Sequence, residues 1–287
     1  GQGSSLTATA TLRKTGATYS LVVPQARLNG TSGQALLALS RFQMALGEGA
    51  PRFTGNFATG GPGLPQISGR MEQDGANDIQ LRLRMADYRV KGGSLAVPDL
   101  MVAQGRNGTI GFAGRAIASG LIPGGSARNL TLPILGNWSP DRGLSVWRQC
   151  TAIAFDSLRI ANLALDKRRL QLCPPPGGAI VRSTAKGTSF AAGTPSLDLS
   201  GRLGETRVVL RSGAVGLAWP GNLKARNVDV ALGPPESETR FRLANLDARI
   251  RSDVSGRFAG AEARLFAVPL DILQAEGNWR FAGGKLE

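Results

Sequence analysis

The residues that could carry out catalysis are few in this chain of 287 residues. It contains no histidine, which excludes Ser-His-Asp and Cys-His nucleophilic sites and most zinc enzymes. Ser189 lies in GTSFAAG, which lacks the second glycine of a nucleophile elbow. The glycine-rich stretch GRNGTIGFAG, from Gly105 to Gly114, has no GK[ST] sequence and opens no helix, so we expect no phosphate-binding loop. The sequence therefore predicts a protein that is not an enzyme.

Carboxylates that could work as acid and base, or hold a metal, are also scarce. Asp74 with Asp78, and Glu236 with Glu238, lie in polar, turn-like stretches, which is typical of solvated loops. A solenoid polysaccharide lyase can act without histidine, through arginine and Ca²⁺, but no cluster of aspartates offers a calcium site. We predict neither a metal nor a cofactor.

The only two cysteines are Cys150 and Cys173. They are either one disulfide or two unrelated buried thiols. Both lie beside strand-like runs that are close enough in sequence to be neighbours in a sheet, which favours the disulfide. A disulfide would indicate an oxidising compartment.

The chain is strongly basic, with a formal net charge of +14 and a pI of about 11.2. Such a balance favours contact with nucleic acid, an anionic lipid headgroup or an acidic protein, unless the arginines only solvate an outward face. Lys167, Arg168 and Arg169 could contact phosphate, but they follow Asp166 in what reads as a solvated hairpin end. Aromatic residues make up 6% of the chain, too few for stacking on bases, so we predict no nucleic-acid partner.

Alternation of apolar and polar residues is the main structural signal. In IQLRLRM the side chains of Ile79, Leu81, Leu83 and Met85 would share one face of a strand. Similar runs begin at positions 7, 19, 196, 226 and 239, and Gly, Pro and Asn-Gly turns separate them. The pattern predicts an all-β fold, with an elongated, curved and mostly antiparallel sheet of roughly 20 strands.

One segment departs from this pattern. In residues 32–47, Leu36, Leu39, Phe42 and Leu46 recur at helical spacing, with Ser32 as a cap. We predict one or two short helices, one of them here. The Gly- and Pro-rich stretch 47–66 is then expected to be a loop and a sub-boundary within a single domain over residues 1–287.

A single sheet of this length leaves its apolar side uncovered. Stacked at about 4.8 Å, the strands would extend on the order of 100 Å, with an apolar face larger than soluble monomers normally expose. Such an open groove needs an occupant, for which acyl chains are suited, while Arg and Lys at its rim could meet the phosphates. The predicted lining residues are Ile79, Leu81, Leu83, Met85, Leu158, Ile160, Leu163, Leu165, Leu170, Leu172, Phe241 and Leu243.

Several stretches resemble a known family. They are CTAIAFDSLRIANLALDKRRLQLCPPPGGAIV, the related phrases RIANLAL, KARNVDVAL, SARNLTLPIL and RLANLDARI, and the predicted helix followed by GGPGLP. Together they resemble the C-terminal part of the AsmA-like envelope lipid-transport superfamily, of the YdbH and TamB type. The resemblance implies a β-groove in the periplasm that conducts phospholipid passively between the inner and outer membranes.

The same resemblance implies further properties. The protein would be anchored to the inner membrane by a helix outside this fragment, since no run of about 18 apolar residues occurs in it. Cys150 and Cys173 would form a periplasmic disulfide, and a small outer-membrane lipoprotein would add strands to the sheet edge.

Two other interpretations remain open. One is a secreted right-handed β-helix that acts as an adhesin or a glycan-binding protein, which predicts a repeat of identical residues near every 20 positions. The other is a structural scaffold domain with a closed core.

Overall fold

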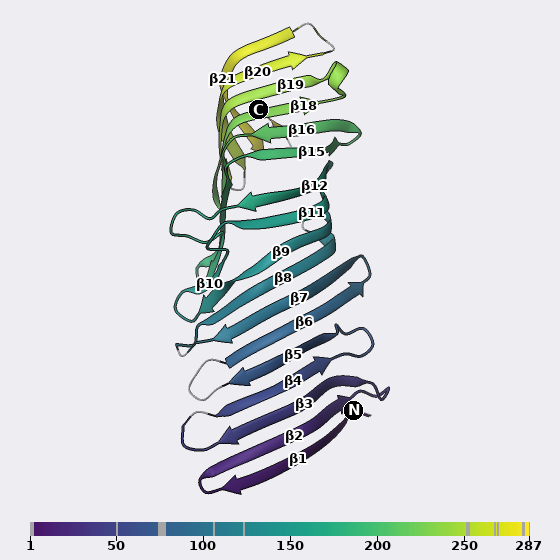
Figure 1. The fold of residues 1–287 in the computed structure, drawn as a ribbon. Coiled ribbons are helices and arrows are strands. Elements are labelled where there is room, and N and C mark those ends of the chain that lie inside the picture. The colour runs from purple at the N-terminus through teal and green to yellow at the C-terminus, as the bar shows by residue number, and fades with distance from the viewer. Residues whose placement is uncertain are drawn as a thin grey trace. The chain divides into compact units, whose positions relative to one another are not determined.

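The computed structural model describes residues 3–286 apart from positions 50, 74–78, 106, 123, 251–252, 267, 269 and 283–284. It is an antiparallel sheet of 22 strands that does not close into a barrel (Figure 1). Within the described residues the only helix is one 3₁₀ turn, Pro235–Ser237. The prediction of a long, open, antiparallel all-β sheet is confirmed.

The chain divides into two compact units. Unit 1 comprises residues 1–118 and 132–142, and unit 2 comprises residues 119–131 and 143–287. The strands of unit 1 are β1 (Ser5–Thr15), β2 (Thr18–Asn29), β3 (Ala35–Leu46), β4 (Arg52–Thr59), β5 (Ile67–Gln73), β6 (Ile79–Val90) and β7 (Gly93–Gln104). Two strands contribute to both units, β8 (Ile110–Ile122) and β9 (Gly125–Ser139).

Unit 2 contains the remaining strands. They are β10 (Gly143–Val146), β11 (Thr151–Ile160), β12 (Leu163–Leu172), β13 (Val181–Thr184), β14 (Gly187–Thr194), β15 (Leu197–Leu203), β16 (Thr206–Ser212), β17 (Val215–Trp219), β18 (Gly221–Leu232), β19 (Thr239–Ile250), β20 (Val254–Leu265), β21 (Leu270–Ala282) and β22 (Lys285–Leu286).

The helix predicted over residues 32–47 is wrong, because this segment forms strand β3. Arg41 adopts a left-handed backbone conformation with φ 51°, and the ladder with β4 shifts register there. The bulge places one extra residue between Leu39 and Phe42. Apolar residues three apart therefore stay on one face of a strand, which imitates helical spacing.

Two other local predictions are also wrong. The stretch 47–66, expected to be a loop, contains strand β4, whose ladder with β5 runs from Phe53 to Ala58. Residues 166–169, expected at a hairpin end, lie inside β12, and the turn before that strand is at Ala161 and Asn162. The single-domain assignment with a sub-boundary near 47–66 stays a prediction.

Two of the recurring Asn phrases contain a left-handed backbone position inside a strand. Asn129 in SARN and Asn227 in KARN have φ values of 50° and 49°. Asn tolerates this left-handed conformation better than most residues. In β18 the apolar positions move from Ala225 to Val228 across Asn227, while the ladder with β19 keeps one register, so that both halves of the strand keep the same apolar face. Long strands can thus bend without reversing their faces.

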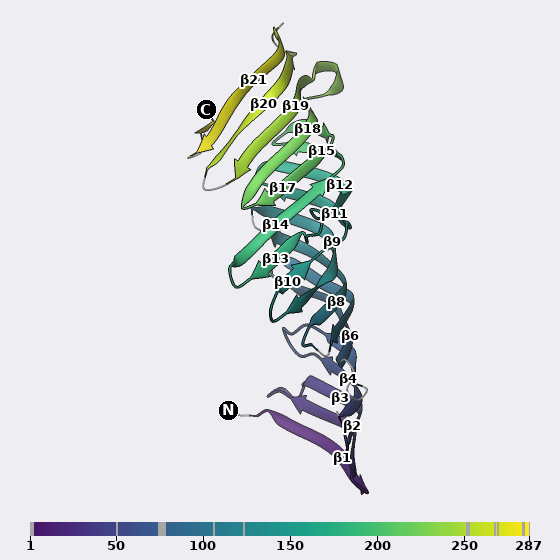
Figure 2. The same ribbon diagram turned by 90° about the vertical axis from the view of Figure 1, so that its left-hand side faces the viewer.

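In unit 2 the bent strands form two rows. The C-terminal half of β18 pairs with β16, and its N-terminal half pairs with β17. From β16 the first row continues through β15 and β12 to β11. From β17 the second row continues through β14 and β13 to β10. Figure 2 shows β10, β13, β14 and β17 as a separate row beside β11, β12 and β15.

A disulfide joins Cys150 to Cys173, which confirms the prediction made from the two cysteines. It links the start of β11 to the end of β12, and Cys173 also pairs with Gly193 of the second row. The side chains of Phe155 and Ile180 are almost fully buried, with 2% and 0% of their surface exposed. A small closed core therefore exists in unit 2.

The disulfide should stabilise unit 2. Replacing both cysteines, Cys150→Ala with Cys173→Ala, should lower the free energy of unfolding by about 3 kcal/mol, because the bond closes a loop with a sequence separation of 23 residues. Urea denaturation with and without reductant measures the effect. Reductant should destabilise only the wild type, and equal midpoints for both proteins would contradict the expectation.

The left-handed position in β18 should depend on a residue that tolerates positive φ. Asn227→Val should destabilise the protein by about 1–2 kcal/mol relative to Asn227→Gly, because a β-branched residue is strained in the left-handed region. Thermal denaturation of the two variants tests this, and equal melting temperatures would argue against the left-handed conformation at Asn227.

Candidate functional site

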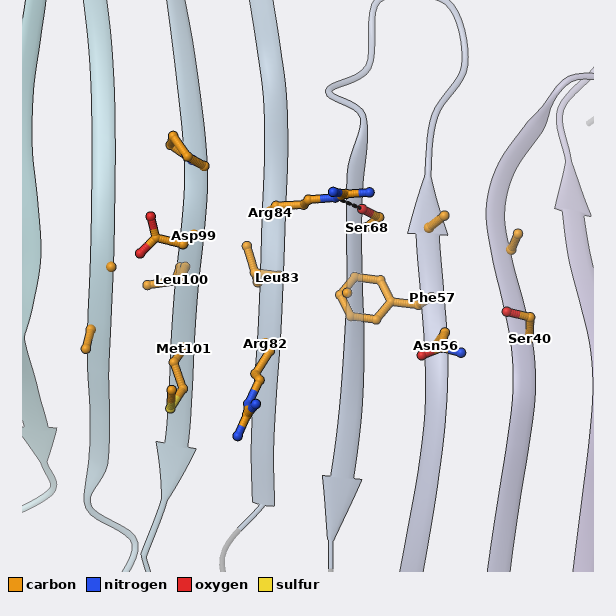
Figure 3. A pocket seen from close by; sticks show the side chains of 16 residues that line it. Ser40, Asn56, Phe57, Ser68, Arg82, Leu83, Arg84, Asp99, Leu100 and Met101 are labelled. Atoms are coloured by element: carbon orange, nitrogen blue, oxygen red, sulfur yellow. Dashed lines mark hydrogen bonds between the residues drawn. The ribbon is translucent and has the colours of Figure 1, made fainter.

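Apolar side chains of unit 1 align across neighbouring strands. Phe57 of β4, Gly69 of β5, Leu83 of β6 and Leu100 of β7 lie directly opposite one another. Gly69 leaves room for the ring of Phe57, which would lie 2.7 Å from a Cβ at that position and extends across β5 towards Leu83 (Figure 3). Directly opposite residues share one face of a sheet. The row is therefore part of one apolar face.

The other predicted lining residues of β6 belong to the same face. Leu81 lies opposite Met71 of β5 and Val102 of β7. Exposure varies along the strand, from 9% for Met85 to 38% for Ile79. The structure thus brings the four predicted residues of β6 onto one apolar face of unit 1.

A second apolar row crosses unit 2. Leu158, Leu165, Gly201, Val208 and Leu232 lie opposite one another in β11, β12, β15, β16 and β18. Two residues further along these strands, towards the hairpin ends, lies a shorter row formed by Ile160, Leu163 and Leu203. Four of the predicted lining residues are therefore adjacent in two rows.

The remaining predicted residues form two further groups. Leu170 and Leu172 lie opposite Ile153 and Thr151 of β11, in the half of β12 that leads to the disulfide. Phe241 and Leu243 lie opposite apolar residues of β18 and β20. These partners are Val230, Val228, Ala263 and Ala261. That all twelve residues line a lipid groove stays a prediction.

Sequence reasoning missed much of the apolar surface. In unit 1, Phe42 packs against Phe53 with ring centroids 6.3 Å apart, and both lie in segments that were assigned to a helix and a loop. The signal that could have revealed the strand of Phe42 was the alternation of apolar and polar residues on either side of Arg41. In the second row of unit 2, Phe190 lies opposite Val181 and Trp219, and no single strand there is long enough to show a pattern.

The apolar faces are only partly covered by protein. The buried hydrophobic side chains among the described residues are few. They are Val23, Met85, Ala127, Phe155, Ala179, Ile180, Leu199, Val208, Ala225 and Ala248. The accessible surface is 18637 Å². A compact monomer of this mass would expose about 11,700 Å², and two separate domains of half the mass about 14,100 Å². The extra surface indicates sheets with an uncovered face.

Comparison with protein families decides which class of protein this is. The whole chain, residues 1–287, matches the family model described as YdbH-like, intermembrane phospholipid transport protein YdbH. The chain belongs to the YdbH-like family. Comparisons with curated proteins and with solved structures found no match.

YdbH-like proteins transport phospholipid between membranes, so the family binds phospholipid and links two membranes. It is a family of lipid transporters and not a family of enzymes. Membership places the chain in the cell envelope, with which the Cys150–Cys173 disulfide is consistent. The resemblance to envelope lipid-transport proteins is thereby confirmed.

Unit 1 of this YdbH-like sheet carries a depression of about 830 Å³, and Phe57, Leu83 and Leu100 of the apolar row are among the residues that line it. Ser40, Asn56, Ser68 and Arg82 contribute to it, and Arg84 Nε donates a hydrogen bond to Ser68 Oγ over 3.1 Å (Figure 3). These residues alternate along their strands with Phe57 and Leu83 of the apolar face. The depression is therefore lined by residues of the apolar row together with polar side chains of the same strands.

One row of charges on the polar face of unit 2 is balanced. Asp198, Arg211, Asp229, Arg242 and Glu262 form a cross-strand row of alternating sign. Ion pairs of 3.5 Å, 3.7 Å and 3.8 Å join Arg211 to Asp198, and Arg242 to Asp229 and Glu262. Such pairs support the register of neighbouring strands.

Two carboxylates in unit 2 are held in their charged form. Arg240 donates two hydrogen bonds to Asp229, of 2.8 and 2.6 Å, which lower the pKa of this carboxyl below its ordinary value. The pKa of Asp156 is also lowered, by the hydrogen bond from Asn129 Nδ2 and by Lys167 at 3.1 Å. Lys167 is thus engaged by a carboxylate.

The residues first considered for chemistry do not form a reactive site. Ser189 is exposed on β14 opposite Arg182, and Glu238 forms an ion pair with Arg240 over 3.7 Å. Asp74 and Asp78 lie outside the described residues. Among those that are described, no three acidic or cysteine side chains gather into a possible metal site.

The described part of the chain has no helix long and apolar enough to cross a membrane.

The ion pair of Asp229 should make stability depend on acid. Folding lowers the pKa of Asp229. The stabilisation by this ion pair is therefore complete above the pKa of the unfolded state, near 3.8, and is lost as the pH falls through the pKa of the folded state. Asp229→Asn should cost about 1 kcal/mol at pH 7, and the difference should shrink below about pH 4. Urea denaturation across pH measures this, with Asp141→Asn in an exposed turn as the control. A difference independent of pH would contradict the assignment.

Proposed function

We propose that the apolar faces of the two units bind the acyl chains of phospholipid, and that lipid moves along them passively between the inner and outer membranes. The observation that carries this proposal is the set of apolar cross-strand rows that no protein layer covers. Phe57, Gly69, Leu83 and Leu100 form one of them. The identity of the ligand is inferred from membership in an intermembrane phospholipid transport family.

The energetics of such a face suit transport. Each methylene of an acyl chain that leaves water gains about 0.8 kcal/mol, whichever apolar row it lies against. Aliphatic and aromatic side chains contact a chain without directed hydrogen bonds. A lipid can therefore move between neighbouring rows without losing a specific interaction, and a concentration difference is enough to set its direction.

The proposal extends to the cellular setting. We place the protein in the periplasm, where the Cys150–Cys173 disulfide is stable, anchored to the inner membrane by a segment outside this chain. A small outer-membrane lipoprotein is a suitable partner, because an antiparallel sheet edge accepts an added strand through main-chain hydrogen bonds. We propose no catalytic role for the chain.

The two rival interpretations agree less well with the structure. A right-handed β-helix stacks its strands in parallel, whereas each ladder recorded between the described strands is antiparallel. A scaffold domain with a closed core would bury its apolar residues, yet Leu203 and Ile160 are 48% and 47% exposed.

A charge on the apolar face should block lipid binding. Leu81→Asp should reduce bound phospholipid about tenfold or more, because the carboxylate would lose water where acyl chains lie. The matched control is Gln80→Asp, which places the same charge one residue away on the polar face. Lipid extracted from each purified variant measures the effect, and circular dichroism measures folding.

The assignment of Leu81 to the lipid surface fails under either of two results. In one, the variant keeps its full lipid content. In the other, Leu81→Asp unfolds while Gln80→Asp stays folded, which is expected of an ordinary core residue.

A further inference from the structure

Three arginines lie in one cross-strand row of unit 2 where the strands end. Arg159 of β11 is opposite Ala164 of β12, Ala164 is opposite Arg202 of β15, and Arg202 is opposite Arg207 of β16. All three arginines are exposed. We call Arg159, Arg202 and Arg207 the arginine row.

Unlike the row from Asp198 to Glu262, the arginine row contains no acidic residue. Four residues further along β15 and β16, Asp198 pairs with Arg211. Within the described chain, none of the three arginines forms an ion pair, and Glu205 in the β15–β16 turn is also without one. Arg202 and Arg207 lie directly opposite each other, an arrangement of like charges that destabilises a sheet. An unfavourable feature of this kind is expected where it serves binding.

Directly behind the arginine row lies apolar surface. Ile160 and Leu203 are one residue away from Arg159 and Arg202, Leu163 is one residue away from Ala164 between them, and all three point to the other face of the sheet. Ile160 is 47% exposed and Leu203 is 48% exposed. The turns that follow, at Ala161 and Gly204, end the strands at once. Apolar and basic side chains therefore meet at one rim of the first row of strands.

Backbone packing holds the strands of this rim close together. A Cβ on Gly201 would lie 2.0 Å from the carbonyl oxygen of Ala164, and one on Gly125 would lie 1.8 Å from that of Arg159. Only glycine fits at such an approach. The two glycines thus fix the spacing of β9, β11, β12 and β15 at the arginine row.

We propose that the arginine row binds the phosphate of a phospholipid whose acyl chains lie on the apolar face behind it. The inference rests on the proposed function and adds a headgroup site to it. Arginine stems can lie along apolar surface while their guanidinium groups reach around a strand end. Guanidinium forms paired hydrogen bonds with phosphate oxygens, and a phosphate between Arg202 and Arg207 would remove their repulsion.

The test uses a double variant that carries both Arg202→Gln and Arg207→Gln. The control is a second double variant with the same change of charge, Arg249→Gln together with Arg257→Gln. Both control residues are exposed on the polar face of β19 and β20, outside the arginine row. Binding is measured by calorimetry with dihexanoyl phosphatidylglycerol, dihexanoylglycerol, glycerol phosphate and inorganic phosphate. In this order, the probes supply acyl chains with a phosphate, acyl chains alone, a phosphate headgroup alone and the free phosphate ion.

We expect the test variant to bind the phosphatidyl lipid about tenfold more weakly than wild type, since it loses charge-assisted hydrogen bonds. Its binding of dihexanoylglycerol should not change, and the control should bind both lipids as wild type does. Without ligand, the test variant should melt at a higher temperature than wild type, because two like charges have been removed. A folding defect therefore cannot explain weaker binding if this rise is seen.

Three results would overturn the headgroup site. They are unchanged binding of the phosphatidyl lipid by the test variant, an equal loss in the control, and wild-type binding of glycerol phosphate or inorganic phosphate as tight as that of the lipid. The last result would indicate a free-phosphate site. Failure of the proposed function is a different outcome, in which wild type binds neither lipid.

Discussion

The structure depends on one constraint, which is that long antiparallel strands keep their apolar residues on one face within each unit. In β6 the alternation of Ile79 to Met85 is enough, because the ladder with β5 keeps its register there. In β3 the ladder with β4 shifts at a bulge near Arg41, and β18 passes through the left-handed residue Asn227 without a register shift against β19. In both strands the apolar positions shift by one residue, which keeps them on the same side of a bent strand.

The polar face follows from the same constraint. A basic chain can place its arginines there, where acidic residues of neighbouring strands neutralise them, as Asp229 does for Arg240. In the arginine row, basic side chains without an acidic partner lie beside exposed leucine and isoleucine. An uncovered apolar face and a nearby cluster of guanidinium groups together match the two chemical parts of a phospholipid. The family to which the chain belongs transports that ligand.

Much of the fold could be predicted where a single strand carries its own signal. The alternation of β6 and the turn residues between strands were such signals, and the cysteines indicated their disulfide. Prediction failed at β3, because a bulge turns a spacing of two into a spacing of three and resembles a helix. The two rows of unit 2 could not be predicted, since β17 separates β16 from β18 in the sequence and no local pattern shows that β18 pairs with both of them. The face of β4 was missed for a local reason, its glycine-rich composition around Phe57.

The central claim is that lipid occupies one face of the sheet and not the other. The most direct measurement places a photo-crosslinking amino acid at Leu83 and, in a second protein, at the adjacent Arg82, which faces the opposite side. After irradiation in cells, mass spectrometry identifies what is attached. We predict phospholipid adducts at position 83 and none at position 82. Equal labelling of both positions, or adducts of protein alone at position 83, would contradict the account.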